Sequence, residues 1–138
     1  MPTVAALFTS PGRKSGAATP HESVTAIVGH GFEGCAHANP PKREVLFVSA
    51  DHLDALELAP GTIRENVTVA GDDVEQWPIG QRVKAGGATF EITMVCDPCE
   101  RMEAIRPGLR AKLEGRRGML ARVVDGGELA VGDEITLL

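Results

Sequence analysis

The residues best suited to chemistry are two cysteines three positions apart, Cys96 and Cys99, at the end of a strand-like run that begins at Glu91. A thiol acts as a nucleophile or a metal ligand in its thiolate form, so its surroundings must lower its pKa and leave the sulfur accessible. Pro98 stops a strand from passing through the pair, because proline lacks an N–H and has a fixed φ. Asp97 and Pro98 therefore predict a turn that presents the thiols to a ligand.

Positive charge near this turn would favour a thiolate or an anionic ligand. Arg101, two residues after Cys99, is a fixed cation that can stabilise a thiolate or hold an oxyanion. The other basic residues that could hold an anionic ligand are Arg64, Arg106, Arg116 and Arg117. In an alternative interpretation, the arginines late in the chain are simply the solvated face of a short helix and its loop. These arginines are Arg106, Arg110, Arg116 and Arg117.

The chain length and composition are those of a globular protein with one domain. It has 138 residues, 43% of them hydrophobic and 24% charged, and no apolar run approaches the ~18 residues that a membrane span needs. A net charge of −5 argues against an extended nucleic-acid interface. The N-terminus lacks a positively charged region ahead of its apolar residues, so we expect no secretory signal and a cytoplasmic protein. Three cysteines in a reducing compartment more often react or bind metal than form disulfides.

The elements that must position the cysteines are mostly strands. Sixteen glycines and nine prolines divide the chain into short pieces with β-branched residues at alternating positions. These pieces predict strands over residues 3–9, 23–28, 43–49, 64–69, 77–84, 88–95, 118–124 and 128–138, the last broken at Gly132-Asp133. Gly86-Gly87 predicts a hairpin turn. Helices are predicted over residues 50–58, with Ser49 as N-cap, and over residues 107–113.

This pattern predicts a mainly β fold, a closed or nearly closed barrel with one or two short helices, because closure removes the sheet edges. The polar stretch 10–20 is predicted to be a long connection without regular structure. The loop from Gly29 to His37 has three glycines in six positions, which indicates that its backbone lies close to another group.

The order of these landmarks resembles the MOSC family, the domain named for the C-terminal part of molybdenum cofactor sulfurases. The matching stretches are Gly31-Phe-Glu-Gly-Cys-Ala-His37, Arg64-Glu-Asn-Val-Thr-Val69, Cys96-Asp-Pro-Cys-Glu-Arg101 and Ala130-Val-Gly-Asp133. The resemblance implies a single-domain MOSC-type β-barrel over residues 1–138. It also implies that the barrel holds a molybdopterin-type molybdenum cofactor, or carries sulfur for it.

The resemblance also implies roles for individual residues. The Pro-Cys context makes Cys99, rather than Cys96, the molybdenum ligand. His37 is identified as a pocket donor or proton source, although pinning the loop is an equally good interpretation. The residues expected to hold the cofactor are Gly31, Gly34, Cys35, Arg64, Asn66, Cys99 and Arg101. Glu65 and Asn66 have the ordinary alternative of satisfying turn backbone groups.

Relatives with known activity imply reduction of N-hydroxylated compounds such as amidoximes. Because no flavin or nicotinamide fingerprint appears, a separate reductase is expected to supply the electrons. The expected partners are therefore the cofactor and a redox protein, without pyridoxal phosphate, and the oligomeric state is open. One departure concerns Cys35, which stands where the family usually has a carboxylate. Its thiol adds a third sulfur that would belong to the same pocket if the loop and the turn meet.

Three alternatives remain at this stage. Within the family, the chain could be a non-catalytic carrier of persulfide or of the cofactor. A structural zinc site is possible in principle, because Cys35, His37, Cys96 and Cys99 make a Cys₃His set, although the Cys-x-His half is poorly spaced. A thioredoxin-like pair needs its Cys-x-x-Cys at a helix N-terminus, and the predicted helix start at Pro107 is too late for that.

Overall fold

The computed structural model describes residues 2–10, 18–35 and 44–138, and these residues form strands and short helices. The strands are β1 (Thr3–Thr9), β2 (Thr19–His21), β3 (Ser23–Ile27), β4 (Gly31–Phe32), β5 (Val45–Ser49), β6 (Val67–Ala70), β7 (Arg82–Ala85), β8 (Ala88–Val95), β9 (Met119–Asp125), β10 (Gly127–Ala130) and β11 (Ile135–Leu137). The helices are α1 (Ala50–Ala55), α2 (Glu100–Ile105) and α3 (Leu109–Lys112), with one 3₁₀ turn, η1 (Val74–Gln76).

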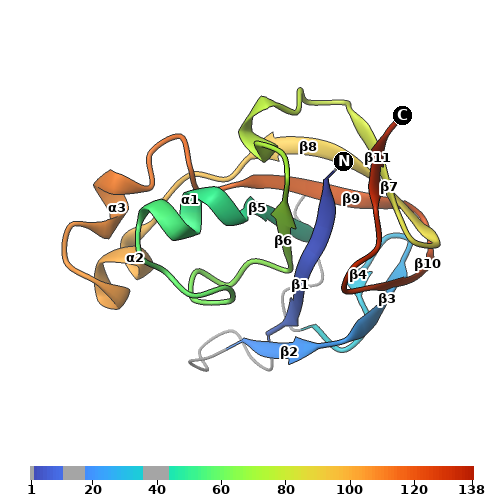
Figure 1. Cartoon of the computed structure of the whole chain (residues 1–138), viewed down its shortest axis with the longest axis horizontal. Helices are drawn as coiled ribbons and strands as arrows, with labels where there is room; N and C mark the ends of the chain where they lie inside the picture. The colour runs from blue at the N-terminus through green and yellow to red at the C-terminus, as the bar shows by residue number, and fades with distance from the viewer. Residues whose placement is uncertain (1, 11–17, 36–43) are drawn as a thin grey trace.

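Two sheets account for the strands. The larger has eight strands in the order β11-β7-β8-β9-β5-β6-β1-β2, and the smaller has the order β10-β3-β4. In the larger sheet β5 and β6 are parallel, and the other neighbouring strands are antiparallel. Figure 1 shows the three helices together at one end of the molecule, with β3, β4, β7, β10 and β11 at the other. The prediction of a mainly β fold is confirmed.

Strand β5 is the centre of the molecule because both of its faces are buried. Side chains alternate between the two faces of a strand. Val45 and Phe47 belong to one apolar cluster, which we call the sheet core. Leu46 and Val48 belong to a second cluster, the helix core, which also holds Met102 of α2. The apolar run predicted as a central strand therefore separates two cores, and the helices cover its outer face.

Of the expected closed or nearly closed barrel, full closure is not found, because no continuous ladder of the described strands joins the two edges of the larger sheet. Its ends approach each other where Thr3 forms an isolated bridge with Glu134. Nearby, the Val4 N–H donates to the Asp133 carbonyl at 2.9 Å and the Ile135 N–H to the Pro2 carbonyl at 2.8 Å. Strand β11 has only three residues, and the register of β1 shifts between Val4 and Ala6 where it pairs with β6.

The predicted helices differ from the observed ones in length and number. Helix α1 ends at Ala55 instead of residue 58, and the Ser49 hydroxyl does not cap it. That hydroxyl accepts instead from the Val74 N–H at 2.7 Å. Helix α3 covers only Leu109–Lys112 of the predicted 107–113, and α2 was not predicted. None of the helices in the described ranges is long and apolar enough to cross a membrane.

Most strand predictions agree closely with the structure. Strands β1 and β8 have the predicted bounds, and the Gly86-Gly87 hairpin joins Ala85 and Ala88, which pair directly. The strand predicted over residues 77–84 starts only at Arg82. The strand predicted from Arg64 starts at Val67, so Arg64, Glu65 and Asn66 form an irregular segment ahead of β6.

Candidate functional site

The cysteine turn begins where β8 leaves the sheet. The Cys96 N–H donates to the Gly118 carbonyl at 3.0 Å, which extends the pairing of Val95 with Met119 by one residue. The Cys96 side chain is buried, with 7% exposed, and packs in the helix core. The interpretation of Cys96 as a core residue thus agrees with its position.

Cys99 differs from Cys96 because its side chain is exposed. It is the N-cap residue of α2, in an extended conformation, and its side chain makes no capping hydrogen bond. The argument that no helix starts near the cysteines is therefore wrong, since α2 begins at Glu100. The first turn of α2 contains the acidic residues Glu100 and Glu103, and Arg101 is exposed beside them. The thiol is accessible to a ligand from solvent.

Arg117 lies across from the cysteine turn and is buried, with 8% exposed. Its Nε and Nη1 atoms have no hydrogen-bond partner. The alternative of a solvated face is thus wrong for Arg117. It is also wrong for Arg106, which is half-buried and donates from Nη1 to the Leu56 carbonyl at 2.6 Å and from Nη2 to the Glu57 carbonyl at 3.0 Å. Arg106 therefore caps the C-terminus of α1, whereas Arg110 and Arg116 are exposed as that interpretation expects.

Glu75, which the sequence did not single out, bonds the residue next to Arg117, and His52 lies close to Glu75. The Gly118 N–H donates to Glu75 Oε1 at 2.6 Å. Burial raises the pKa of Glu75, while the Gly118 hydrogen bond and the nearby His52 oppose that rise. His52 Nε2 is 3.5 Å from Asp73 Oδ1, and His52 Nδ1 is buried without a partner. No local pattern marks these residues, because η1 and α1 meet only in the folded chain.

Asn66 and Cys35 lie together in the structure, as part of one buried network. The Asn66 Nδ2 group donates to Cys35 Sγ at 3.5 Å and to the Phe8 carbonyl at 3.2 Å. Asn66 Oδ1 accepts from the Leu46 N–H at 2.9 Å, and Cys35 Sγ also accepts from the Ser10 N–H at 3.4 Å. The sulfur of Cys35 thus occupies an acceptor position of the kind that a carboxylate would fill.

Cys35 and Cys96 are not brought into one pocket. Cys35 belongs to the sheet core and Cys96 to the helix core. Across the described parts of the chain, no group of three or more His, Cys, Asp or Glu side chains is placed to hold a metal ion. The described members of the proposed zinc set, Cys35, Cys96 and Cys99, are therefore not gathered into one metal site.

The remaining predicted cofactor residues have varied surroundings. Arg64 has a positive φ of 63°, a conformation that non-glycine residues adopt only where the surrounding structure imposes it. Glu65 Oε2 accepts from the Gly61 N–H and the Thr68 hydroxyl, both at 2.9 Å. Gly31 lies against the Glu44 carbonyl, which an added Cβ would approach to 2.7 Å, whereas Gly34 has open space there. His37 lies outside the described residues.

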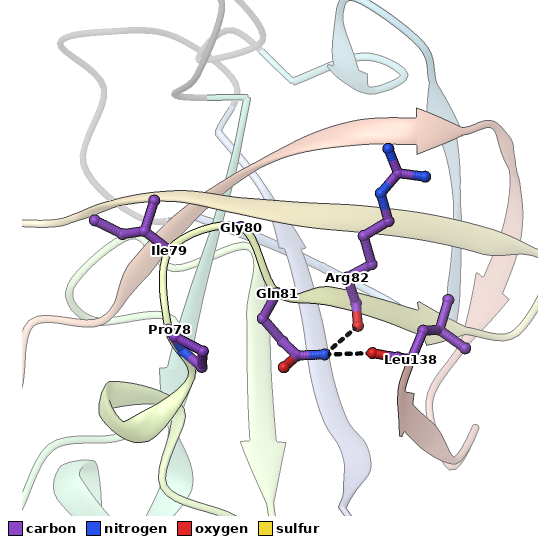
Figure 2. Close-up of a pocket in the computed structure, with 6 residues that line it drawn as sticks. All are labelled: Pro78, Ile79, Gly80, Gln81, Arg82 and Leu138. Atoms are coloured by element: carbon purple, nitrogen blue, oxygen red, sulfur yellow. Dashed lines mark hydrogen bonds between the residues drawn. The ribbon is translucent and has the colours of Figure 1, made fainter.

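A separate hollow of about 480 Å³ is lined by Pro78, Ile79, Gly80, Gln81, Arg82 and Leu138. Figure 2 shows the Gln81 amide between two carbonyls, and Nε2 donates to Arg82 O and to Leu138 O at 2.9 Å each. None of the residues predicted to be functional lines this hollow. The hollow is therefore distinct from the cysteine turn.

Comparison with solved structures defines the class of fold. YuaD from Bacillus subtilis superposes with a TM-score of 0.82 at 22% identity, covering 98% of this chain and 94% of that one. YiiM from Geobacillus stearothermophilus has a TM-score of 0.83 at 18% identity, with 100% and 75% covered. YiiM from Escherichia coli has a TM-score of 0.80 at 16% identity, with 100% and 70% covered. At these identities the likeness shows the fold alone.

The family follows from the sequence itself. The MOSC domain model matches residues 35–136, and the chain therefore belongs to the MOSC family. A search of curated proteins found no significant match.

The donor set at the cysteine turn fits the cofactor that the family is associated with. A thiolate is a soft ligand suited to a sulfur-bound metal, and the exposed Cys99 thiol is not used as a helix cap. An anionic pterin phosphate would need cationic donors, and Arg117 offers two that have no partner. The first turn of α2, which follows Cys99 directly, contains the acidic residues Glu100 and Glu103, so the positive charge for an anionic ligand would have to come from other residues.

Proposed function

We propose that this chain binds molybdenum cofactor at the cysteine turn, with Cys99 as the sulfur ligand. The observation that carries the proposal is the contrast between the two thiols, because Cys99 is exposed and uncapped while Cys96 is packed in the helix core. Arg64 and Arg101 are proposed to offset the negative charge of the cofactor. Asn66 is proposed to act indirectly in this site, since its amide orders β5, β1 and Cys35.

The proposed reaction is the reduction of N-hydroxylated compounds. The cofactor, when bound, supplies two-electron chemistry at molybdenum. Reduction of an N–OH group to N–H consumes two electrons and two protons and releases water, with the electrons delivered by a separate reductase protein. The chain's own residues hold the cofactor and exclude competing ligands, and His37 is proposed as the proton donor.

The test is to express the chain in a host that makes molybdenum cofactor and to measure bound molybdenum and pterin. We expect Cys99→Ser to lose molybdenum while its fold is retained, because serine is a much poorer ligand for a soft metal. Cys96→Ser is the matched control and should keep most of the metal. Full molybdenum occupancy in both variants would overturn the assignment of Cys99.

A sulfur carrier is the second candidate, because the same exposed thiol can hold a persulfide. Mass spectrometry of the protein as isolated separates the two functions. A mass increase of one sulfur atom on Cys99, removed by a thiol reductant and not accompanied by pterin, would favour the carrier. Substitution of Cys35 by aspartate, measured in the same way, tests whether the thiol in the Gly-rich loop weakens cofactor binding.

A further inference from the structure

Arg117 is a buried cation that lacks hydrogen-bond partners on two of its nitrogens. Only 8% of it is exposed, and its Nε and Nη1 atoms are buried without a hydrogen-bond partner. In the part of the chain that the structure describes, no carboxylate forms an ion pair with it. Buried arginine is ordinarily paired, since removing a cation from water without a compensating anion is costly.

The backbone next to Arg117 is closely packed. Gly118 follows this arginine with a φ of 107°, and a Cβ there would clash with the Phe47 carbonyl oxygen. The Gly118 N–H is bonded to Glu75 Oε1 at 2.6 Å, and the Gly118 carbonyl accepts from the Cys96 N–H. Contacts of Gly118 with Phe47, Glu75 and Cys96 therefore fix the backbone from which Arg117 extends.

Among the described residues, no carboxylate neutralises this charge. The Glu75 carboxylate accepts from the N–H of the neighbouring Gly118 and forms no ion pair with Arg117. The guanidinium carries five N–H donors and stays protonated at any physiological pH. Two of its three nitrogens lack acceptors, so an external group that brings both negative charge and several oxygens would complete the site.

We propose that Arg117 is the cation of a binding site for a tetrahedral oxyanion beside the cysteine turn. The ligand is either a free oxyanion or the phosphate monoester of a larger molecule that reaches the turn. Arginine suits this role because its planar fork matches the oxygen geometry of phosphate. The site does not depend on Cys99 binding molybdenum, because it rests on the buried guanidinium alone.

The test observes the Nε–H group of Arg117 directly, in ¹⁵N-labelled full-length protein. The chain is titrated at constant ionic strength with inorganic phosphate, sulfate or molybdate, with a phosphate monoester such as phosphoserine, and with acetate as the control. We expect a saturable shift of the Arg117 Nε–H resonance with at least one tetrahedral anion and a much smaller shift with acetate. The resonance is assigned by its loss in Arg117→Lys.

Arg116→Lys is the matched control, since it makes the same change at an exposed neighbour. We expect Arg117→Lys to weaken oxyanion binding by at least about tenfold and Arg116→Lys by less than about twofold, because lysine lacks the planar fork. A Nε–H resonance that responds to none of the anions, or that responds equally to acetate, would overturn the proposal.

Two further measurements distinguish a free oxyanion from a phosphate monoester, and the oxyanion proposal from the cofactor proposal. Tighter binding of the monoester than of inorganic phosphate would identify a phosphate-bearing ligand, and the reverse would identify a free oxyanion. In Cys99→Ser the oxyanion response should persist even though molybdenum is lost. Loss of molybdenum with no Arg117 response would leave the cofactor proposal standing and refute this one.

Discussion

The two ends of the central strand β5 differ in how completely their buried polar groups are paired. At its first residues, Asn66 Oδ1 accepts from the Leu46 N–H, and Glu44 Oε1 accepts from the Val123 N–H. At its last residues, the chain packs against Gly118, and Arg117 beside it has two buried nitrogens without partners. Buried polar groups that stabilise a fold are bonded within it, so the second end is where an outside partner is needed.

The contrast also separates residues that share a sequence motif. Asn66 and Cys35 come from two stretches that resemble the family, and they bond each other inside the protein. The Cys96 stretch continues instead into α2, where Cys99 is exposed. The first end is not fully paired, since Glu65 Oε1 also lacks a partner. The main difference between the two ends of β5 is therefore the buried guanidinium of Arg117, which lies at the second end and has two nitrogens without partners.

The largest effect is expected from Gly118→Ala, which tests whether the second end depends on close backbone packing. An alanine would adopt a strained φ and force its Cβ against the Phe47 carbonyl. We expect a loss of about 3 to 5 kcal/mol, measured by urea unfolding, from strain and overpacking together. Gly115→Ala is the control, because Gly115 has a positive φ but open space around it, and it should cost about 1 kcal/mol. Equal losses would mean that packing at Gly118 is unimportant.

Arg117→Met sharpens the comparison by removing the unpaired charge while keeping its volume. In the absence of an added anion we expect this variant to be more stable, by about 1 to 4 kcal/mol, because an apolar side chain does not pay for burial of a charge. The measurement is the midpoint of urea unfolding with an unchanged slope. Arg116→Met should change stability by less than about 0.5 kcal/mol, since its side chain is exposed. A less stable Arg117→Met would show that the charge stabilises the fold.

Asn66→Ala probes the first end of β5. Removing the amide leaves the buried Leu46 N–H without its acceptor, and we expect a loss of about 1 to 3 kcal/mol in thermal or urea unfolding. Gln81→Ala removes an amide that also makes two hydrogen bonds, but at the surface, and should cost much less. Similar losses in the two variants would contradict the distinction between buried and exposed amides.

The smallest effect concerns the pH dependence of stability at Glu75. Burial raises the pKa of this carboxyl, so its ionisation opposes folding above the raised pKa and this penalty disappears as the pH falls below the unfolded value of about 4.3. Glu75→Gln keeps an oxygen that can accept from Gly118. We expect it to be slightly more stable at pH 7, by well under ~1.4 kcal/mol because the side chain is half exposed, and equal to the parent near pH 3. A variant less stable at pH 7 would oppose this.

Local pattern in the sequence determined most of the strands. Alternating β-branched residues and the Gly86-Gly87 turn defined β8 and its hairpin, because strand periodicity and turn chemistry are properties of neighbouring residues. The start of α2 at Glu100 was missed, since Pro98 suggested only a turn and a six-residue helix has too few residues for a clear period. The Cys96–Cys99 stretch and the family were likewise readable from residue types and order.

Only the tertiary structure decided which polar residues are paired. Arg106 and Arg117 look alike in sequence, yet one caps α1 and the other is buried without partners. Cys96 and Cys99 are three positions apart, yet one is packed and the other exposed. Burial and pairing depend on contacts between segments far apart in the chain, such as Gly118 with Glu75 and Cys96. Those contacts are set by the packing of the strands, which no single stretch of sequence encodes.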